Sequence, residues 1–178
     1  DVITTRQGEL DEDELWAQVL SALQQAVDIL IDMRRREGDN LKEDILKNLG
    51  AIGLEVSEIE KRAGFIVEEY RDKLLKRLEV LSDGIELDPD RVYQEVVIFA
   101  DRSSINEEIV RLRSHASQMH SILDDGGAIG RKLDFLVQEM HREINTIGSK
   151  ANDLSISKAV IEVKSRLEKV REQIQNIE

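Results

Sequence analysis

The chain has 178 residues, of which 40 % are hydrophobic, 35 % are charged and only 3 % are aromatic, with one proline and no cysteine. This composition excludes a disordered chain and is typical of long helices packed on one another. The net charge is −12, and the first 60 residues carry most of it with 15 acidic and six basic residues, which makes them a poor surface for nucleic acid.

The first half of the sequence predicts two long helices. Acidic residues 11–14 suit a helix N-terminus, hydrophobic residues then recur at helical spacing, and Gly38 is expected to end this first helix. A second helix is expected from Asn40 to Leu81, because its hydrophobic residues also step by three or four. We therefore predict that residues 1–84 form a long antiparallel helical hairpin.

The second half of the sequence predicts four shorter helices that form a compact helical bundle over residues 85–178. Each has an apolar stripe of helical period, the first two also have a start signal, and a Gly-Gly turn at 126–127 separates the middle two. The predicted starts are Pro89 behind Asp88, the residues after Ser104, a position near Arg131 and a position near Ser155. The predicted fold class is all-α, and its long apolar stripes are expected to cause self-association.

The helix predicted over 131–148 carries polar residues that the fold itself does not require. One face has amide, guanidinium and hydroxyl groups mixed with a carboxylate, and basic and acidic residues lie beside it. This mixture is more typical of a recognition surface than of a plain solvated face. The residues of that face are Arg131, Asp134, Gln138, Arg142, Asn145 and Ser149, flanked by Lys132, Glu139, Glu143, Thr146 and Lys150.

Glu139 and Glu143 are candidate metal ligands. They are one helical turn apart, so their side chains share a face and would favour a divalent cation such as Mg²⁺ or Mn²⁺ between them. The alternative is an exposed acidic pair flanked by Arg142 and Lys132. Because cysteine is absent and no two histidines have the helical spacing of ligands, the sequence predicts no zinc-type cluster.

The preceding helix carries a second polar stripe of Glu108, Arg111, His115 and Gln118. A histidine near a carboxylate and an arginine can act as general acid or base in phosphodiester cleavage, since its pKa lies near neutrality. The alternative is a partly buried histidine that is hydrogen-bonded within the bundle.

Several segments together resemble the signature of the YicC/YloC family. The first set is Gly130-Arg131-Lys132-Leu133-Asp134-Phe135, Gln138-Glu139-Met140, Arg142-Glu143, Asn145-Thr146-Ile147 and Ser149-Lys150-Ala151. Upstream, Glu107-Glu108-Ile109, Arg111-Leu112 and Ser114-His115 are similar to another family element, and residues 171–178 are similar to the family's ending. His141 departs from the pattern, because the family usually has asparagine there.

The resemblance implies a cytoplasmic, stress-related endoribonuclease that cleaves single-stranded RNA with Mn²⁺ or Mg²⁺ and takes part in small-RNA turnover. It also implies a homo-oligomer, such as a hexamer, and polynucleotide phosphorylase as a partner. The implied metal ligands are Glu139 and Glu143, and the implied catalytic residues are Glu108, His115, Glu139, Arg142 and Glu143. The implied RNA-binding residues are Arg111, Arg131, Lys132, Gln138, Asn145, Ser149 and Lys150.

Family members carry a further N-terminal domain that we expect this chain to lack, with residues 1–10 as the linker from it, so this part alone is expected to be inactive. Two alternatives remain. The chain is a non-enzymatic helical adaptor that oligomerises and presents RNA or recruits an exoribonuclease, or it is an oligomerisation arm with catalysis in the other domain. No hydrophobic run approaches the roughly 18 residues of a membrane span, so no membrane contact is expected.

Overall fold

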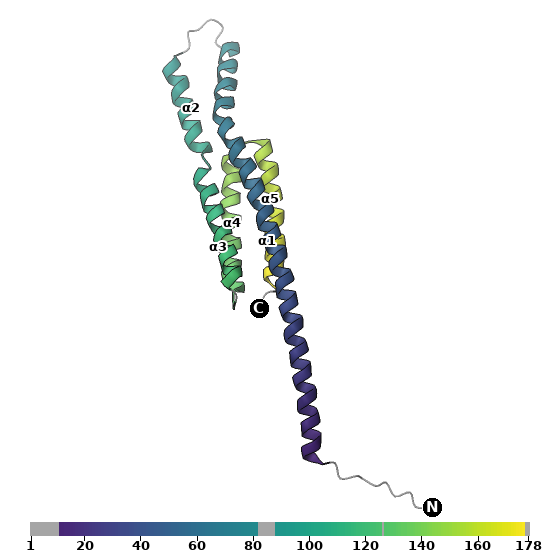
Figure 1. Ribbon diagram of the computed structural model, residues 1–178. Helices are drawn as coiled ribbons and strands as arrows, with labels where there is room; N and C mark the ends of the chain where they lie inside the picture. The colour runs from purple at the N-terminus through teal and green to yellow at the C-terminus, as the bar shows by residue number, and fades with distance from the viewer. Residues whose placement is uncertain (1–10, 82–87, 126, 177–178) are drawn as a thin grey trace, which may run out of the picture. The chain divides into compact units, whose positions relative to one another are not determined.

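The computed structural model describes residues 11–81, 88–125 and 127–176. It divides the chain into two compact units, Asp1–Asn40 and Leu41–Glu178, which are described separately here. The described residues form helices and no strand, so the predicted all-α class is confirmed (Figure 1). The helices are α1 (Glu12–Leu81), α2 (Pro89–Ser103), α3 (Asn106–Asp125), α4 (Gly130–Lys150) and α5 (Leu154–Ile174).

The turn predicted at Gly38 is wrong, because α1 continues through this residue. A glycine ends a helix when it adopts a positive φ, and Gly127 is the described glycine that does so. Within a helix a glycine costs about 1 kcal/mol relative to alanine, a cost that does not by itself end a helix. The two helices predicted on either side of Gly38 are one continuous helix in the structure. The predicted linker 1–10 lies outside the described residues, and α1 ends at Leu81, where the second predicted helix was expected to end.

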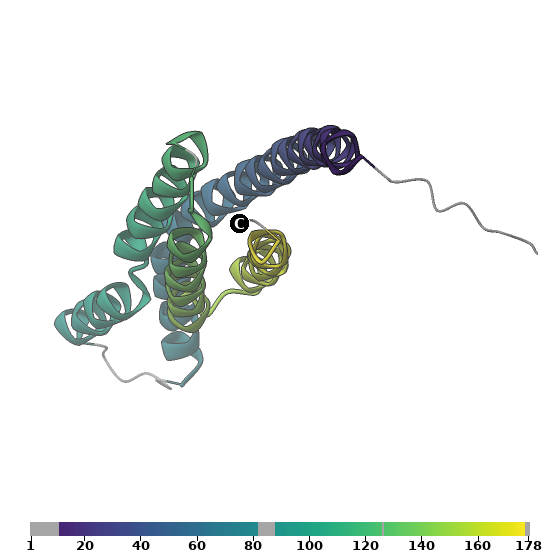
Figure 2. The ribbon, with the colours of Figure 1, turned by 90° about the horizontal axis from the view of Figure 1, so that it is seen from below.

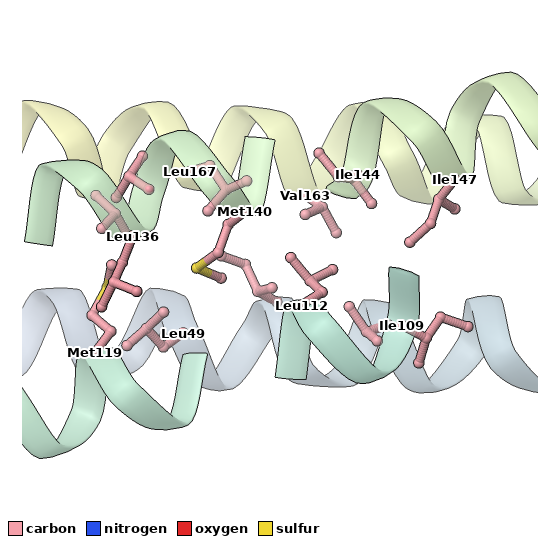
Figure 3. Close-up of a cluster of buried hydrophobic side chains, with 14 of the residues drawn as sticks. Leu49, Ile109, Leu112, Met119, Leu136, Met140, Ile144, Ile147, Val163 and Leu167 are labelled. Atoms are coloured by element: carbon pink, nitrogen blue, oxygen red, sulfur yellow. The ribbon is translucent and has the colours of Figure 1, made fainter. Parts of the chain in front are cut away.

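The unit Leu41–Glu178 is built around α4, which packs against α3 on one side and α5 on the other (Figures 1 and 2). The part of α1 after Asn40 belongs to the same unit and contributes Ile45, Ile52 and Ile59 to its core. The interior is aliphatic, with methionines that fill the space between α3 and α4 (Figure 3). The helix α4 buries Leu133, Leu136, Val137, Met140, Ile144 and Ile147.

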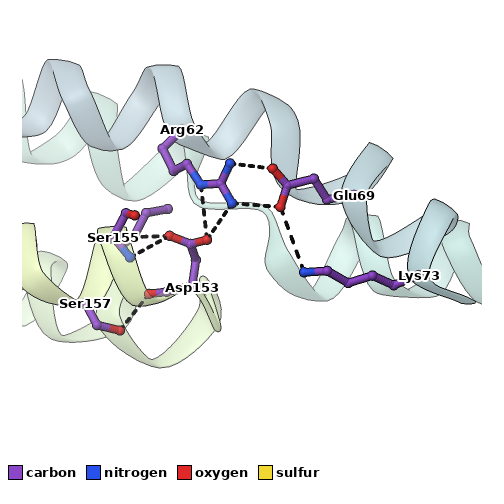
Figure 4. Close-up of polar contacts among 7 residues, drawn as sticks. Arg62, Glu69, Lys73, Asp153, Ser155 and Ser157 are labelled. Carbon is purple, nitrogen blue, oxygen red and sulfur yellow. Dashed lines mark hydrogen bonds and ion pairs between the residues drawn. The ribbon is translucent and has the colours of Figure 1, made fainter.

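The start of α5 is fixed to α1 through Asp153. The Asp153 carboxylate caps α5 by accepting hydrogen bonds from the backbone N–H groups of Ser155 and Ile156. It also accepts from the Arg62 guanidinium at 2.8 Å, and Arg62 binds Glu69 on its own helix (Figure 4). The hydrogen bond from Arg62 holds the pKa of Asp153 below its ordinary value, although burial opposes this. One charged group therefore joins a helix cap to an interhelical ion pair.

Two more ion pairs join α1 to α3. The Arg113 guanidinium lies 2.7 Å from the Glu60 carboxylate, and Lys42 lies 2.8 Å from Asp124. Together with Arg62–Asp153, these pairs fix α3 and α5 to α1 at the edges of the aliphatic core. Within the described residues, no helix combines the length and the apolarity needed to cross a bilayer.

Candidate metal centre

A row of polar side chains follows the seam between α3 and α4. On α4, Glu143 and Lys150 are seven residues apart, which is two turns, so they share the edge that faces α3. On α3, Glu108 and His115 are also seven residues apart and share the edge that faces α4. The hydrophobic residues beside these edges form the α3–α4 core, so packing fixes the side on which each polar residue lies.

His115, Glu139 and Glu143 come together in this row. Each offers one ligand atom, and these atoms all lie within 4.8 Å of one another. A cation with bond lengths of about 2.0–2.2 Å joins ligand atoms up to about 4.4 Å apart, so small side-chain rotations bring the three into range. Two carboxylates and an imidazole are donors that suit a divalent metal ion. The residues present therefore fit the metal that the resemblance implies.

Glu143 is the most enclosed member of this cluster, with 5 % of its surface exposed. Its ion-pair partner is Arg111, whose Nη1 lies 3.7 Å from Oε1, too far for a hydrogen bond. Arg111 also binds Glu107 one turn away. A buried carboxylate needs compensation for lost hydration, and a loosely placed arginine supplies only part of it.

His115 is half-buried, and its Nδ1 atom is buried with no hydrogen-bond partner in the described part of the chain. The sequence left open the alternative of a partly buried histidine that is hydrogen-bonded within the bundle. The Nδ1 atom of His115 does not have such a hydrogen bond. His115 belongs to α3, whereas Glu139 and Glu143 belong to α4, so the sequence spacing did not reveal their proximity.

Glu108 and Lys150 lie at one end of the row and neutralise one another. The Lys150 Nζ donates to Glu108 Oε1 at 2.6 Å, and Glu108 has only 8 % of its surface exposed. Burial raises the pKa of Glu108, but the Lys150 hydrogen bond, a backbone hydrogen bond and the charge of Arg111 together lower it below its ordinary value. This carboxylate is therefore charged and paired, and it stands apart from the cluster of three.

Arg142 and Lys132 border the cluster on α4. Arg142 Nη1 lies 3.9 Å from Glu139 Oε2, and its side chain is largely exposed. Lys132 is exposed and lies two turns before Glu139, on the same side of the helix. Both cationic groups are therefore free to contact an anion that approaches from solvent.

The structure separates the remaining predicted residues from the cluster. Gln138 donates to Asp134 at 2.7 Å, and Asp134 lies 3.8 Å from Arg171 on α5. These residues belong to the face that the sequence predicted beside Glu139 and Glu143, and this face lies on the α5 side of α4. Arg131, Asp134 and Arg171 line a separate pocket at the α5 side, while Asn145 and Ser149 are exposed, with Ser149 bound to the Thr146 carbonyl.

Two further residues clarify the α5 side of α4. His141 faces α5, where its Nε2 lies 3.7 Å from Glu168, and burial lowers its pKa. It is therefore not a member of the cluster, despite its position between Glu139 and Glu143 in the sequence. Arg171 was not predicted as a site residue. Its position in the family-like ending was visible, but no spacing linked it to Asp134.

The described fold and cluster define a class: an all-helical protein with a two-carboxylate, one-histidine group between successive helices. Residues 59–178 match the family described as Endoribonuclease YicC-like, C-terminal, and residues 1–43 match its N-terminal region. The chain therefore belongs to the YicC-like endoribonuclease family. Part of the N-terminal region that the sequence was expected to lack is present.

Two curated relatives are both called "Probable endoribonuclease YicC". The protein of Clostridioides difficile (strain 630) is 49 % identical over 179 residues, which cover 100 % of this chain and 61 % of the relative. The protein of Haemophilus influenzae (strain ATCC 51907 / DSM 11121 / KW20 / Rd) is 38 % identical over 170 residues, which cover 96 % of this chain and 58 % of the relative. The chain thus spans about three fifths of the length of these relatives.

Proposed function

We propose that this chain supplies the metal centre of a divalent-metal-dependent endoribonuclease that cleaves single-stranded RNA. The observation that carries this proposal is the convergence of His115, Glu139 and Glu143 within 4.8 Å of one another. The family and the names of the relatives support RNA as the substrate. In the proposed hydrolysis, a bond forms between a water oxygen and phosphorus, and the bond between phosphorus and a ribose oxygen breaks.

Each residue of the seam has a role in this proposal. Glu139 and Glu143 hold the divalent cation, Mn²⁺ or Mg²⁺, which supplies Lewis acidity to the scissile phosphate and lowers the pKa of a water. Arg111 and Arg142, which border the carboxylates, bind phosphate oxygens through their planar donors. The attacking water loses a proton and the leaving ribose oxygen gains one. His115 is close enough either to move such a proton or to bind the cation.

The path of the RNA strand follows from the distribution of cationic side chains. Lys132 and Arg142 are exposed beside the cluster, whereas Lys150 is partly neutralised by Glu108. We propose that the strand enters from the Lys132 side of the seam and that Lys150 contacts it less strongly. Arg131, Gln138, Asn145 and Ser149 form the second flank of α4, where they contact RNA outside the reacting phosphate.

The decisive test is cleavage of end-labelled single-stranded RNA by the protein carrying Glu143→Gln or Glu139→Gln. Each variant removes one ligand charge without changing side-chain size, so cleavage is expected to fall about 100-fold, or about 2.7 kcal/mol in activation free energy. A chelator should abolish cleavage by the wild type, and Mn²⁺ should restore it. The matched control is Glu172→Gln, which removes an exposed carboxylate on α5. Wild-type rates in both ligand variants would contradict the proposal.

The unit Asp1–Asn40 favours a second, compatible role in assembly. Its helical residues expose hydrophobic side chains that include Trp16, Leu23, Ile29, Leu30 and Met33, each more than half exposed. Such a surface is unfavourable in water unless another surface covers it. We propose that copies of this chain bury it in a homo-oligomer, with six subunits, as the family resemblance implies. In the adaptor alternative, this assembly presents small RNAs to polynucleotide phosphorylase in the cytoplasm without cleaving them.

A further inference from the structure

His115 lies within the same candidate site as Glu139 and Glu143. Its ligand atom lies within 4.8 Å of those of both Glu139 and Glu143, a separation that one cation closes with small rotations. The imidazole is therefore as close to each carboxylate as a shared set of metal ligands requires.

The burial of the cluster supports the same role. The Nδ1 atom of His115 is buried and has no hydrogen-bond partner among the described residues. Glu143 is 5 % exposed, and its arginine partner is 3.7 Å away. An unsatisfied imidazole nitrogen and an under-compensated carboxylate are both costly in an enclosed site. A cation bound by the two carboxylates and by this nitrogen would remove both costs together.

We propose that His115 is the third protein ligand of the cation held by Glu139 and Glu143, and that its nitrogen makes the site prefer first-row transition ions to Mg²⁺. This inference rests on the proposed function for the presence of a cation, and it goes further by naming the ligand set and the class of metal. Mg²⁺ is bound almost entirely by oxygen atoms and retains several waters. Imidazole nitrogen is a better ligand for transition ions, so Mn²⁺ is expected to bind roughly tenfold more tightly than Mg²⁺.

The test uses Mn²⁺ alone as the probe and requires no RNA. Pulsed electron paramagnetic resonance of bound Mn²⁺ detects a directly coordinated nitrogen nucleus, and Mg²⁺ competition gives the relative affinities. The wild type is expected to show nitrogen coupling. His115→Ala is expected to lose that coupling and to bind Mn²⁺ roughly 10-fold to 100-fold more weakly. The matched control is His120→Ala, an exposed histidine five residues later on the same helix, which should keep both properties.

The outcomes separate this inference from the proposed function. Bound Mn²⁺ without nitrogen coupling in the wild type, or coupling that persists in His115→Ala, would overturn the role of His115 while leaving a carboxylate site intact. No Mn²⁺ binding by the wild type would overturn the inference and remove the metal from the proposed mechanism as well. If His115→Ala loses helical content by circular dichroism, His115→Gln, which keeps a polar side chain of similar size, takes its place.

Discussion

Lys150 keeps the buried Glu108 carboxylate paired inside the α3–α4 seam, at an N–O distance of 2.6 Å. Lys150→Met removes this partner and leaves the buried Glu108 carboxylate with only a backbone hydrogen bond and the charge of Arg111. We expect the free energy of unfolding to fall by about 1–2 kcal/mol. This is less than for a fully buried ion pair, because Lys150 is still partly exposed to solvent. Urea denaturation monitored by circular dichroism measures the change.

The control for this prediction is Lys158→Met, which changes an exposed lysine at the start of α5. Its unfolding free energy should stay within about 0.5 kcal/mol of the wild type. Equal losses in the two variants would show that the Glu108–Lys150 pair contributes nothing specific to stability.

At the level of single residues, the sequence predicted which side chains lie close together on one helix. It did not predict which side chains of two different helices lie close together. The proximity of Glu139 and Glu143 follows from their spacing of one turn. The approach of His115 depends on how α3 packs on α4, and no spacing within either helix contains that information. The separation of Gln138 from the cluster, in contrast, follows from α4 alone, because consecutive helical residues point about 100° apart.

At the level of single helices, Asp153 fixes the start of α5 within the unit Leu41–Glu178. Asp153→Ala removes the cap of α5 and the partner of Arg62 together, so we expect a loss of about 2 kcal/mol in unfolding free energy. Asp153→Asn keeps a capping oxygen and loses the charge, so it should lose about half as much. Chemical denaturation of both variants measures the difference. Equal losses would contradict the capping contribution.

The close approach of α4 and α5 at Gly148 gives a second prediction for single elements. A Cβ at Gly148 would lie 3.1 Å from Val160 Cγ1, whereas one at the exposed Gly53 would meet nothing within 4 Å. Gly53→Ala should therefore raise the unfolding free energy by about 0.5–1 kcal/mol through helix propensity. Gly148→Ala should fail to show this gain, since crowding of Val160 offsets it. A comparable gain at both positions in thermal denaturation would contradict a tight α4–α5 contact.

Element boundaries were predictable where local chemistry decides them. Asp88 and Pro89 predicted the start of α2, and the structure has Asp88 as its cap with its side chain accepting from the Asp90 N–H. Gly38 failed as a predicted end of a helix. A glycine permits a left-handed residue but does not impose one, and the chain around Gly38 continues as a helix.

Across the whole unit Leu41–Glu178, several carboxylates depend on being charged. Hydrogen bonds from Arg62 hold the pKa of Asp153 below its ordinary value of 3.8 and that of Glu69 below 4.5. The folded state therefore binds fewer protons than the unfolded state at these groups. Their contribution is fully present above the unfolded pKa values and is lost as the pH falls through the folded values.

We therefore expect a stability that is nearly constant from about pH 6 to pH 5 and that decreases below about pH 4. Thermal unfolding at a series of pH values measures this dependence. Arg62→Met removes the shared partner of both carboxylates and should make the decrease below pH 4 shallower than in the wild type. An unchanged slope in Arg62→Met would show that acid sensitivity arises from other groups.

Assembly of the whole protein is tested through the exposed stripe of the unit Asp1–Asn40. Leu23→Glu with Leu30→Glu places two charges on hydrophobic surface that is about half exposed in a single chain. We expect this double variant to have a smaller mass by sedimentation equilibrium than the wild type, because buried charges oppose association. Gln18→Glu with Gln25→Glu adds the same charge at polar positions and should leave the mass unchanged. A double leucine variant of wild-type mass would contradict a role of this stripe in assembly.

The three residues of the candidate metal centre come from α3 and α4, two consecutive helices joined by a short connection. Contacts between neighbouring segments close small loops and form early in folding. The seam should therefore order before α1 packs against the bundle. During synthesis, all three side chains of the cluster are present once α4 has been made. A cation bound there at that stage would stabilise the α3–α4 contact, so metal supply would influence how quickly the protein folds.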